Sequence, residues 1–227
     1  MKNFFLSSSG VKCIAIATMA IDHIGVLFFP EQLLFRVVGR ASFPLYAFLI
    51  AEGSRKTSDA RKYLFRLLTF AVISQLPYML FRQAAGIQYM KLNIFFTLAG
   101  GLLALIALNR LPLRYSLSSV AGILALAYYG PFDYGAYGVA TILASGLFLR
   151  LRSAGPFFLF SLHIAKALLS FFSGALSLQI YATMSVPLLM RYNGERGMPL
   201  PRRLLYWFYP AHLLLLWLIW YSLKRFG

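Results

Sequence analysis

The sequence predicts an all-α membrane protein, a polytopic helical bundle of about nine transmembrane helices (eight to ten) that forms a single domain over residues 1–227. Of these residues 60% are hydrophobic and only 12% are charged, and the mean hydropathy is +0.71. Soluble globular domains do not have this composition. Apolar runs recur from end to end without a long polar segment, and most approach the roughly 20 residues that a helix needs to cross a bilayer.

The first run, residues 10–29, reads GVKCIAIATMAIDHIGVLFF and holds Asp22 and His23 well inside an apolar stretch. An ionisable side chain in the hydrocarbon costs about 2.5–3.5 kcal/mol, so such groups usually face a bundle interior or a polar cavity. Lys12 precedes His23 by eleven residues, which places both on one helix face roughly 16 Å apart. Asp22 and His23 are therefore the first candidates for chemistry. The alternative is that Lys12 reaches the headgroups and His23 only bonds a neighbouring helix.

The second run, residues 33–53, carries Arg36 and Arg40 four residues apart and hence on one face, and Glu52 near its end. Pro44 cannot donate to the carbonyl of Arg40, so we expect a kink there. Asp22 lies about 100° round its helix from His23. It can orient the ring of His23, or it can pair with one of the two arginines and hold the fold.

The remaining spans follow in order. Ser58 or Asp59 is expected to cap the third, which Pro77 bends. In the last span, Pro210 frees the carbonyl of Tyr206 next to His212. The seventh span contains His163 and Lys166, and the eighth contains Pro187. Both spans are therefore candidates to face the bundle interior. The expected spans are residues 59–81, 92–108, 115–130, 136–150, 155–172, 174–190 and 203–223.

The net charge of +16 comes from basic residues in short loops between apolar runs. This pattern indicates membrane topology, not nucleic-acid binding, although part of the charge remains available to a polyanionic ligand. Most loop cations fall on one side if the N-terminus is inside, and only Arg82 and Lys91 then lie in outer loops. Lys224 and Arg225 would lie outside, against the trend, but we expect the N-terminus inside and the C-terminus outside. One cysteine excludes an internal disulfide, and the spacing of histidines and acids predicts no metal site.

Seven motifs together resemble the TraX family of bacterial membrane proteins, in order and across nearly the whole chain. They are GVKCIAIATMAIDHIGVLFFP, RVVGRASFPLYAFLIAEG, KYLFRLLTFAVISQLPY, LNIFFTL, DYGAYGV, RYNGERG and FYPAHLLLL. More distantly, the first two spans resemble those of the heparan-α-glucosaminide acetyltransferase group. The interval from Lys12 to His23 is similar to the basic-x10-His signature of the acyltransferase-3 family, with lysine where that family has arginine.

The resemblance implies a multi-pass acyltransferase of the bacterial inner membrane. Its donor would be cytoplasmic acetyl-CoA or another acyl-CoA, and its acceptor an amine or hydroxyl such as a pilin N-terminus. A histidine near its ordinary pKa suits the base that takes the acceptor's proton. His23 is the expected base, Asp22 its orienter and His212 the alternative base. The substrate-binding candidates are Arg36, Arg40, Glu52, Asn93, Asp133, Tyr134 and His212. The donor-binding candidates are Lys12, Arg55, Lys62, Arg66, Asn193, Arg196 and Arg203.

Two other functions stay open from the sequence: a small proton-coupled transporter, and a non-catalytic pilus or envelope assembly protein. For the acyltransferase we expect a tunnel through the bundle. Its donor mouth would be inside, and its acceptor mouth outside, between the loops at Pro30-Glu31 and Phe132-Asp133.

Overall fold

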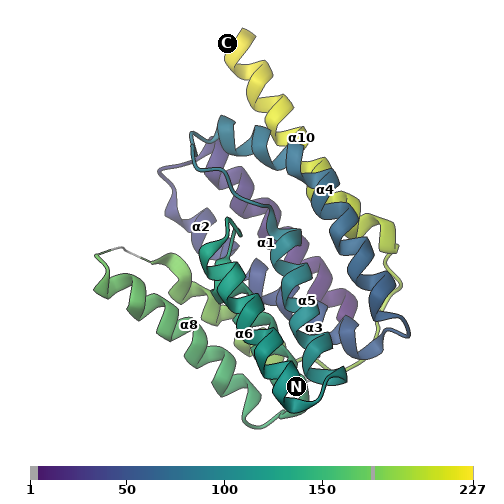
Figure 1. The fold of residues 1–227 in the computed structure, drawn as a ribbon. Helices are drawn as coiled ribbons and strands as arrows, with labels where there is room; N and C mark the ends of the chain where they lie inside the picture. The colour runs from purple at the N-terminus through teal and green to yellow at the C-terminus, as the bar shows by residue number, and fades with distance from the viewer. Residues whose placement is uncertain (1–4, 175–176, 227) are drawn as a thin grey trace.

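The protein is helical throughout its described part (Figure 1). The computed structural model describes residues 5–174 and 177–226, without the side chains of residues 202, 203 and 226. Within these residues no strand forms, and the predicted all-α fold class is confirmed. The elements are α1 (Ser8–Phe28), α2 (Leu33–Gly39), α3 (Ser42–Lys56), α4 (Ala60–Ala84), α5 (Ile94–Arg110), α6 (Leu113–Tyr129), α7 (Gly135–Arg150), α8 (Gly155–Phe172), the 3₁₀ helix η1 (Leu178–Met184), α9 (Ser185–Met190) and α10 (Arg202–Phe226).

Short polar side chains set several helix starts. The Oγ of Ser7 accepts from the N–H of Gly10, the carboxylate of Asp59 from Lys62, and the Oδ1 of Asn93 from Phe95. Each bond satisfies a backbone donor that the first turn leaves without a partner. The bond from Lys62 also lowers the pKa of Asp59. Of the two residues expected to cap the third span, Asp59 is the one that does so.

Two expected spans are not single α-helices. Residues 33–53 divide into α2 and α3 at Arg40 and Ala41, and residues 178–190 form η1 followed by α9. In both cases the proline, Pro44 or Pro187, is the third residue of the new helix. Its missing N–H costs nothing in a first turn. The proline therefore starts a new helix where the sequence predicted a kinked or continuous one.

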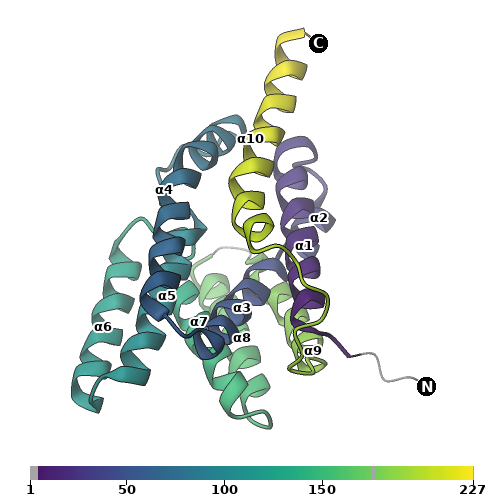
Figure 2. The ribbon, with the colours of Figure 1, turned by 90° about the vertical axis from the view of Figure 1, so that its right-hand side faces the viewer.

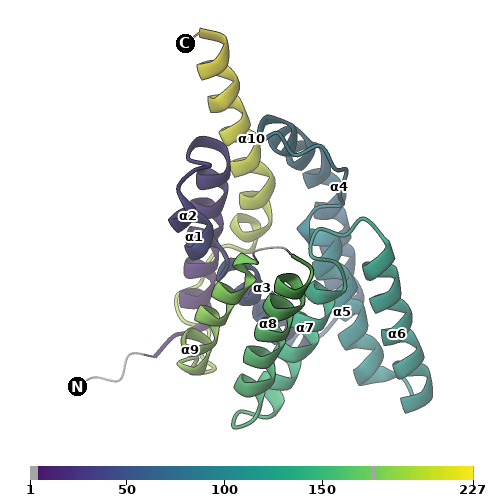
Figure 3. The same ribbon diagram turned by 90° about the vertical axis from the view of Figure 1, so that its left-hand side faces the viewer.

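The loops gather at two opposite ends of the bundle (Figure 2). At the basic end, Leu6 donates to the carbonyl of Arg191 and Arg55 to that of Leu149, at 2.8 and 2.6 Å. At the opposite end, the N–H of Leu92 donates to the carbonyl of Pro131 at 2.7 Å. Counting α2 with α3 and η1 with α9, the described chain passes nine times between these ends, and the end of α10 projects beyond the other helices (Figure 3).

Within the described residues, five segments are long and apolar enough to cross a membrane: α1, residues 33–56 (α2 with α3), α4, α8 and most of α10. Three further apolar helical stretches are shorter: Ile94–Arg110, Gly135–Arg150 and Leu178–Met190. The protein is thus a polytopic membrane protein. The exact number of spans and the inside position of the N-terminus stay predictions.

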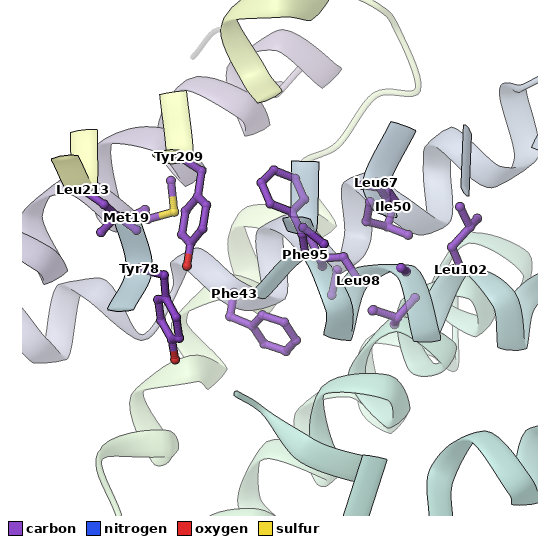
Figure 4. Packing of buried hydrophobic residues seen from close by; sticks show 14 of the residues in the cluster. Met19, Phe43, Ile50, Leu67, Tyr78, Phe95, Leu98, Leu102, Tyr209 and Leu213 are labelled. Atoms are coloured by element: carbon purple, nitrogen blue, oxygen red, sulfur yellow. The ribbon is translucent and has the colours of Figure 1, made fainter. Parts of the chain in front are cut away.

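Close packing positions the site residues. α3 contacts α1, α5 and α7, and the largest apolar cluster joins α1, α3, α4, α5, α7 and α10. In the view of Figure 4, Tyr209 and Tyr78 lie between Met19 and Phe43, with Tyr209 above Tyr78. Gly39 of α2 touches α1 so closely that a Cβ there would overlap the carboxylate of Asp22. This contact holds the arginines of α2 beside the middle of α1.

Candidate functional site

A cavity of about 640 Å³ opens among α1, α3, α4, the loop at residues 130–134 and α10. It brings together six of the predicted site residues from three separate parts of the chain. The six are Asp22, His23, Arg36, Arg40, Asp133 and Tyr134. Asp22 and His23 of the first span and Arg36 and Arg40 of the second therefore face a common space.

The two histidines of α1 and α10 form a relay. The Nδ1 of His23 lies 2.8 Å from the Nε2 of His212, and the Nδ1 of His212 lies 2.7 Å from the carbonyl oxygen of Phe208. A carbonyl can only accept, so the Nδ1 of His212 carries a proton, and in the neutral ring its Nε2 accepts. His23 then donates through Nδ1, which leaves the lone pair on its Nε2. This is the protonation state that a general base at the cavity wall requires.

Aromatic rings fix the orientation of this pair. Phe81 meets the ring of His23 edge to face with centroids 5.0 Å apart, and Phe208 stacks on His212 at 4.6 Å. The carbonyl that holds His212 belongs to Phe208, two residues beyond Tyr206, whose carbonyl Pro210 is expected to free. His212 itself is 9% exposed and stands behind His23 as its partner.

Asp22 pairs with Arg36 of α2 and with Arg40, the residue that directly follows α2. Its carboxylate accepts from Arg36 at 2.7 Å and from Arg40 at 3.4 Å. Of the two alternatives left open by the sequence, the structure shows the ion pair; His212, and not Asp22, contacts the imidazole of His23. Asp22 neutralises one of the two positive charges and holds both guanidinium groups in the cavity wall.

We expect Asp22→Asn to destabilise the protein by about 3 kcal/mol, because it leaves two partly buried guanidinium groups without a counter-ion. Unfolding by a denaturing detergent in mixed micelles measures the change. Asp59→Asn is the matched control, since Asp59 is exposed and asparagine caps a helix equally well. Equal unfolding midpoints for the two variants would mean that the Asp22 ion pairs contribute no net stability.

The loop at residues 130–134 covers the cavity at the end opposite the basic loops. Tyr134 stacks on Phe43 with ring centroids 3.9 Å apart, and the backbone carbonyl of Asp133 accepts from the ammonium of Lys91 at 3.2 Å. Burial raises the pKa of Asp133, while a hydrogen bond from Tyr78 and the nearby charge of Lys91 act to lower it. Phe132 and Asp133 line the cavity as expected, but Pro30 and Glu31 do not.

A second cavity, of about 430 Å³, lies toward the basic end. Four of the described cationic side chains line it: Lys12, Lys56, Arg66 and Arg196. The walls of the two cavities share four residues, Tyr46, Phe95, Leu98 and Leu205. Lys12 and His23, predicted to lie on one face of α1, therefore face adjacent cavities.

Tyr46 stands at the shared wall. Its hydroxyl is buried and has no hydrogen-bond partner in the part of the chain that the structure describes. A buried hydroxyl without a partner costs free energy, and here it lies where a ligand extending from one cavity to the other would pass.

Glu52 joins three segments at the wall of the basic cavity. Its carboxylate accepts from Ser8 of α1 at 2.8 Å, from Lys56 at 2.6 Å and from the hydroxyl of Tyr192. Backbone bonds from Ser8 and Ser9 to the carbonyls of Glu195 and Arg196 complete the junction. This network fixes the loop that brings Arg196 to the cavity.

The other predicted residues lie apart from both cavities. Arg55 donates to the carbonyl of Leu149, Lys62 pairs with Asp59 at 3.5 Å, and Asn193 donates to Glu195. Asn93 is buried and its amide donates to Gln75 and to the carbonyl of Ala71, so it ties α5 to α4. The side chain of Arg203 lies outside the described residues.

Sequence reasoning missed the tyrosines of the larger cavity. Tyr46, Tyr78, Tyr137 and Tyr209 all line it. Tyr78 directly follows Pro77, and Tyr209 directly precedes Pro210. A polar aromatic beside a proline inside a helix was therefore the signal that could have found two of them.

The chain matches the family model described as TraX protein over residues 7–220. A probable fimbrial assembly protein FimC, serogroup H1, from Dichelobacter nodosus is 31% identical over 95% of this chain and 96% of its own length. Protein TraX of Escherichia coli is 30% identical over 68% of this chain and 61% of its own length. A protein of the same name from Escherichia coli strain K12 is 29% identical over 63% of this chain and 56% of its own length. No solved structure matches. The family match spans most of the described helices, and the chain belongs to the TraX family.

Proposed function

We propose that this protein is an acyltransferase of the bacterial inner membrane. It would move an acetyl group from cytoplasmic acetyl-CoA to an amine or hydroxyl, such as the N-terminus of a pilin-like protein. The observation that carries the proposal is the relay from the Phe208 carbonyl through His212 to His23 at the wall of the larger cavity. A purely structural histidine at the position of His23 would not need to face a cavity of this size.

The relay supports acyl transfer in two proton steps. As the acceptor nitrogen or oxygen attacks the thioester carbon, the Nε2 of His23 takes its proton. His212 stabilises the imidazolium by accepting from its Nδ1. When the carbon–sulfur bond breaks, the same Nε2 returns the proton to the departing CoA sulfur. Arg36 and Arg40 share one carboxylate, so positive charge remains for the oxyanion that develops on the carbonyl.

The basic cavity suits the donor. CoA carries phosphates at one end and its thioester at the end of a long pantetheine arm. Phosphates bound by Lys12, Lys56, Arg66 and Arg196 would leave the arm to run past Tyr46 toward His23. The shared wall of the two cavities supports this route, and the buried hydroxyl of Tyr46 would gain a hydrogen-bond partner.

The comparisons support a role in pilus biology. One relative is named for fimbrial assembly, and the family resemblance implies acetylation of a pilin N-terminus. A pilin-like acceptor in or near the membrane would reach the cavity at the end opposite the basic loops.

The deciding experiment uses purified protein in nanodiscs or liposomes, labelled acetyl-CoA and candidate acceptor proteins. Release of free CoA together with a labelled acceptor is the expected result. Uptake of label into sealed liposomes without any acylated product would support the transporter instead. No CoA release with any acceptor would contradict the enzyme assignment.

We expect Arg66→Gln to raise the KM for acetyl-CoA by about tenfold with little change in kcat. The reason is that a contact to the phosphates is equally strong in the ground state and in the transition state. Lys62→Gln is the matched control: it lies one turn away on α4 but lines neither cavity, and its KM should stay near that of the wild type. Steady-state kinetics in nanodiscs make the comparison. Equal KM values for the two variants would mean that Arg66 does not bind the donor's phosphates.

A further inference from the structure

Three cations line the larger cavity without a carboxylate partner. Arg82 and Lys91 lie near the end opposite the basic loops, and Lys166 projects from α8. Among the described residues, none of the three has an ion pair within 4.0 Å. Counting Arg36 and Arg40, five cationic side chains line this cavity against the two carboxylates of Asp22 and Asp133.

Neutral groups hold two of these cations in place. Arg82 donates to the hydroxyl of Tyr78 at 3.2 Å and to the carbonyl of Tyr89 at 2.6 Å. Lys91 donates to the carbonyl of Asp133 at 3.2 Å. These bonds fix the positions of the cations without neutralising their charge. The ammonium of Lys166 has no contact of this kind in the described part of the chain.

The topology makes these charges informative. Arg82 and Lys91 are the two basic residues in the loops that the sequence places outside, where the positive-inside bias works against cations. Both line the larger cavity, and both also line a further hollow of about 480 Å³ formed by the end of α4 and residues 86–91. They therefore mark a positively charged approach toward His23 from the end opposite the basic loops.

The approach fits an elongated acceptor. Phe81 contacts the ring of His23, and Arg82 is the next residue of the chain. An acceptor that enters from the end opposite the basic loops reaches His23 with its nucleophilic group first. The part of the acceptor just behind that group then lies beside the cations. An extended peptide advances about 3.3 Å per residue, so its second to fourth residues would lie beside them.

We propose that the larger cavity selects a peptide N-terminus that carries an acidic side chain within about its first four residues. The inference rests on the proposed function for the chemistry at His23, but the recognition itself needs no turnover. The same positive field would hold the acceptor amine in its neutral, nucleophilic form.

Binding of two matched peptides tests this site. The probes are Ala-Ser-Glu-Ser-amide and Ala-Ser-Gln-Ser-amide, each with a free N-terminus, added to the full-length protein in nanodiscs and measured by calorimetry. We expect the glutamate peptide to bind about tenfold more tightly at low salt. The preference should shrink at high ionic strength.

Lys166→Gln is the cleanest variant, because it removes a charge without breaking a described contact, and it should reduce the preference at least threefold. Arg82→Gln should reduce it as well. Arg114→Gln, which removes an exposed cation beside Tyr115 at the start of α6, is the control and should leave the preference unchanged.

Equal affinity of the wild type for the two peptides would overturn the inference. So would a preference that survives both Lys166→Gln and Arg82→Gln, or one lost equally in Arg114→Gln. Turnover separates this result from the proposed function. Acylation of both peptides with equal affinity refutes only the acidic preference, whereas preferential binding without any acyl product refutes only the acyltransferase.

Discussion

His23→Ala is expected to lower acyl-transfer turnover by roughly 10²–10⁴ while the protein still inserts and folds, because a positioned general base contributes about that much. The ring of His23 packs on Phe81 and bonds one partner, His212. Its truncation therefore removes few packing contacts compared with the loss of proton transfer. Single-turnover kinetics with saturating acetyl-CoA measure the chemical step directly.

His212→Gln is the comparison that tests the relay. Glutamine can accept from the Nδ1 of His23 through its amide oxygen, but it lacks the ring that stacks on Phe208 and therefore holds this acceptor less firmly. We expect a loss of about 10- to 100-fold, as for other residues that orient a reacting group. Wild-type turnover in His23→Ala would refute the assignment. Full loss in His212→Ala with an active His23→Ala would transfer the role of base to His212.

Local signals explain why the helices were predictable. Asp59 and Asn93 cap the helices that follow them, and each contact lies within a few residues of sequence. The divisions at Pro44 and Pro187 were not predicted correctly. A proline marks only where an intrahelical bond is lost, and tertiary packing decides whether the helix bends there or starts anew.

The sequence predicted which residues belong to the site better than it predicted which of them contact each other. Asp22, His23, Arg36 and Arg40 could be identified because an ionisable side chain within a membrane span costs free energy and usually marks a functional site. The residue type and its place in an apolar run are enough to recognise such a side chain. The contact between His23 and His212 joins residues 189 apart in the sequence. No spacing rule relates α1 to α10, so only the fold could select His212 over Asp22 as the neighbour of the imidazole.

Transfer across the membrane is the second large effect that we expect. His23 lies fifteen residues from Ser8, at the start of α1, and five from Phe28, at its end. At 1.5 Å per residue this places it about 22 Å from the basic end and about 8 Å from the other. With the N-terminus inside, the donor has the long route through the basic cavity and past Tyr46, and the acceptor has the short one.

In sealed inside-out vesicles, acetyl-CoA added outside should therefore acylate acceptor that is loaded in the lumen or embedded in the bilayer. Acceptor that is soluble, impermeant and added outside should stay unlabelled. Vesicles opened with detergent are the control, since both acceptors should then react at similar rates. Tyr46→Trp should reduce transfer in both preparations, because a larger ring at the shared wall obstructs the pantetheine arm. Efficient acylation of the impermeant acceptor on the donor's own side of sealed vesicles would contradict a route through the bundle, and would place both substrates in one cavity with a single mouth.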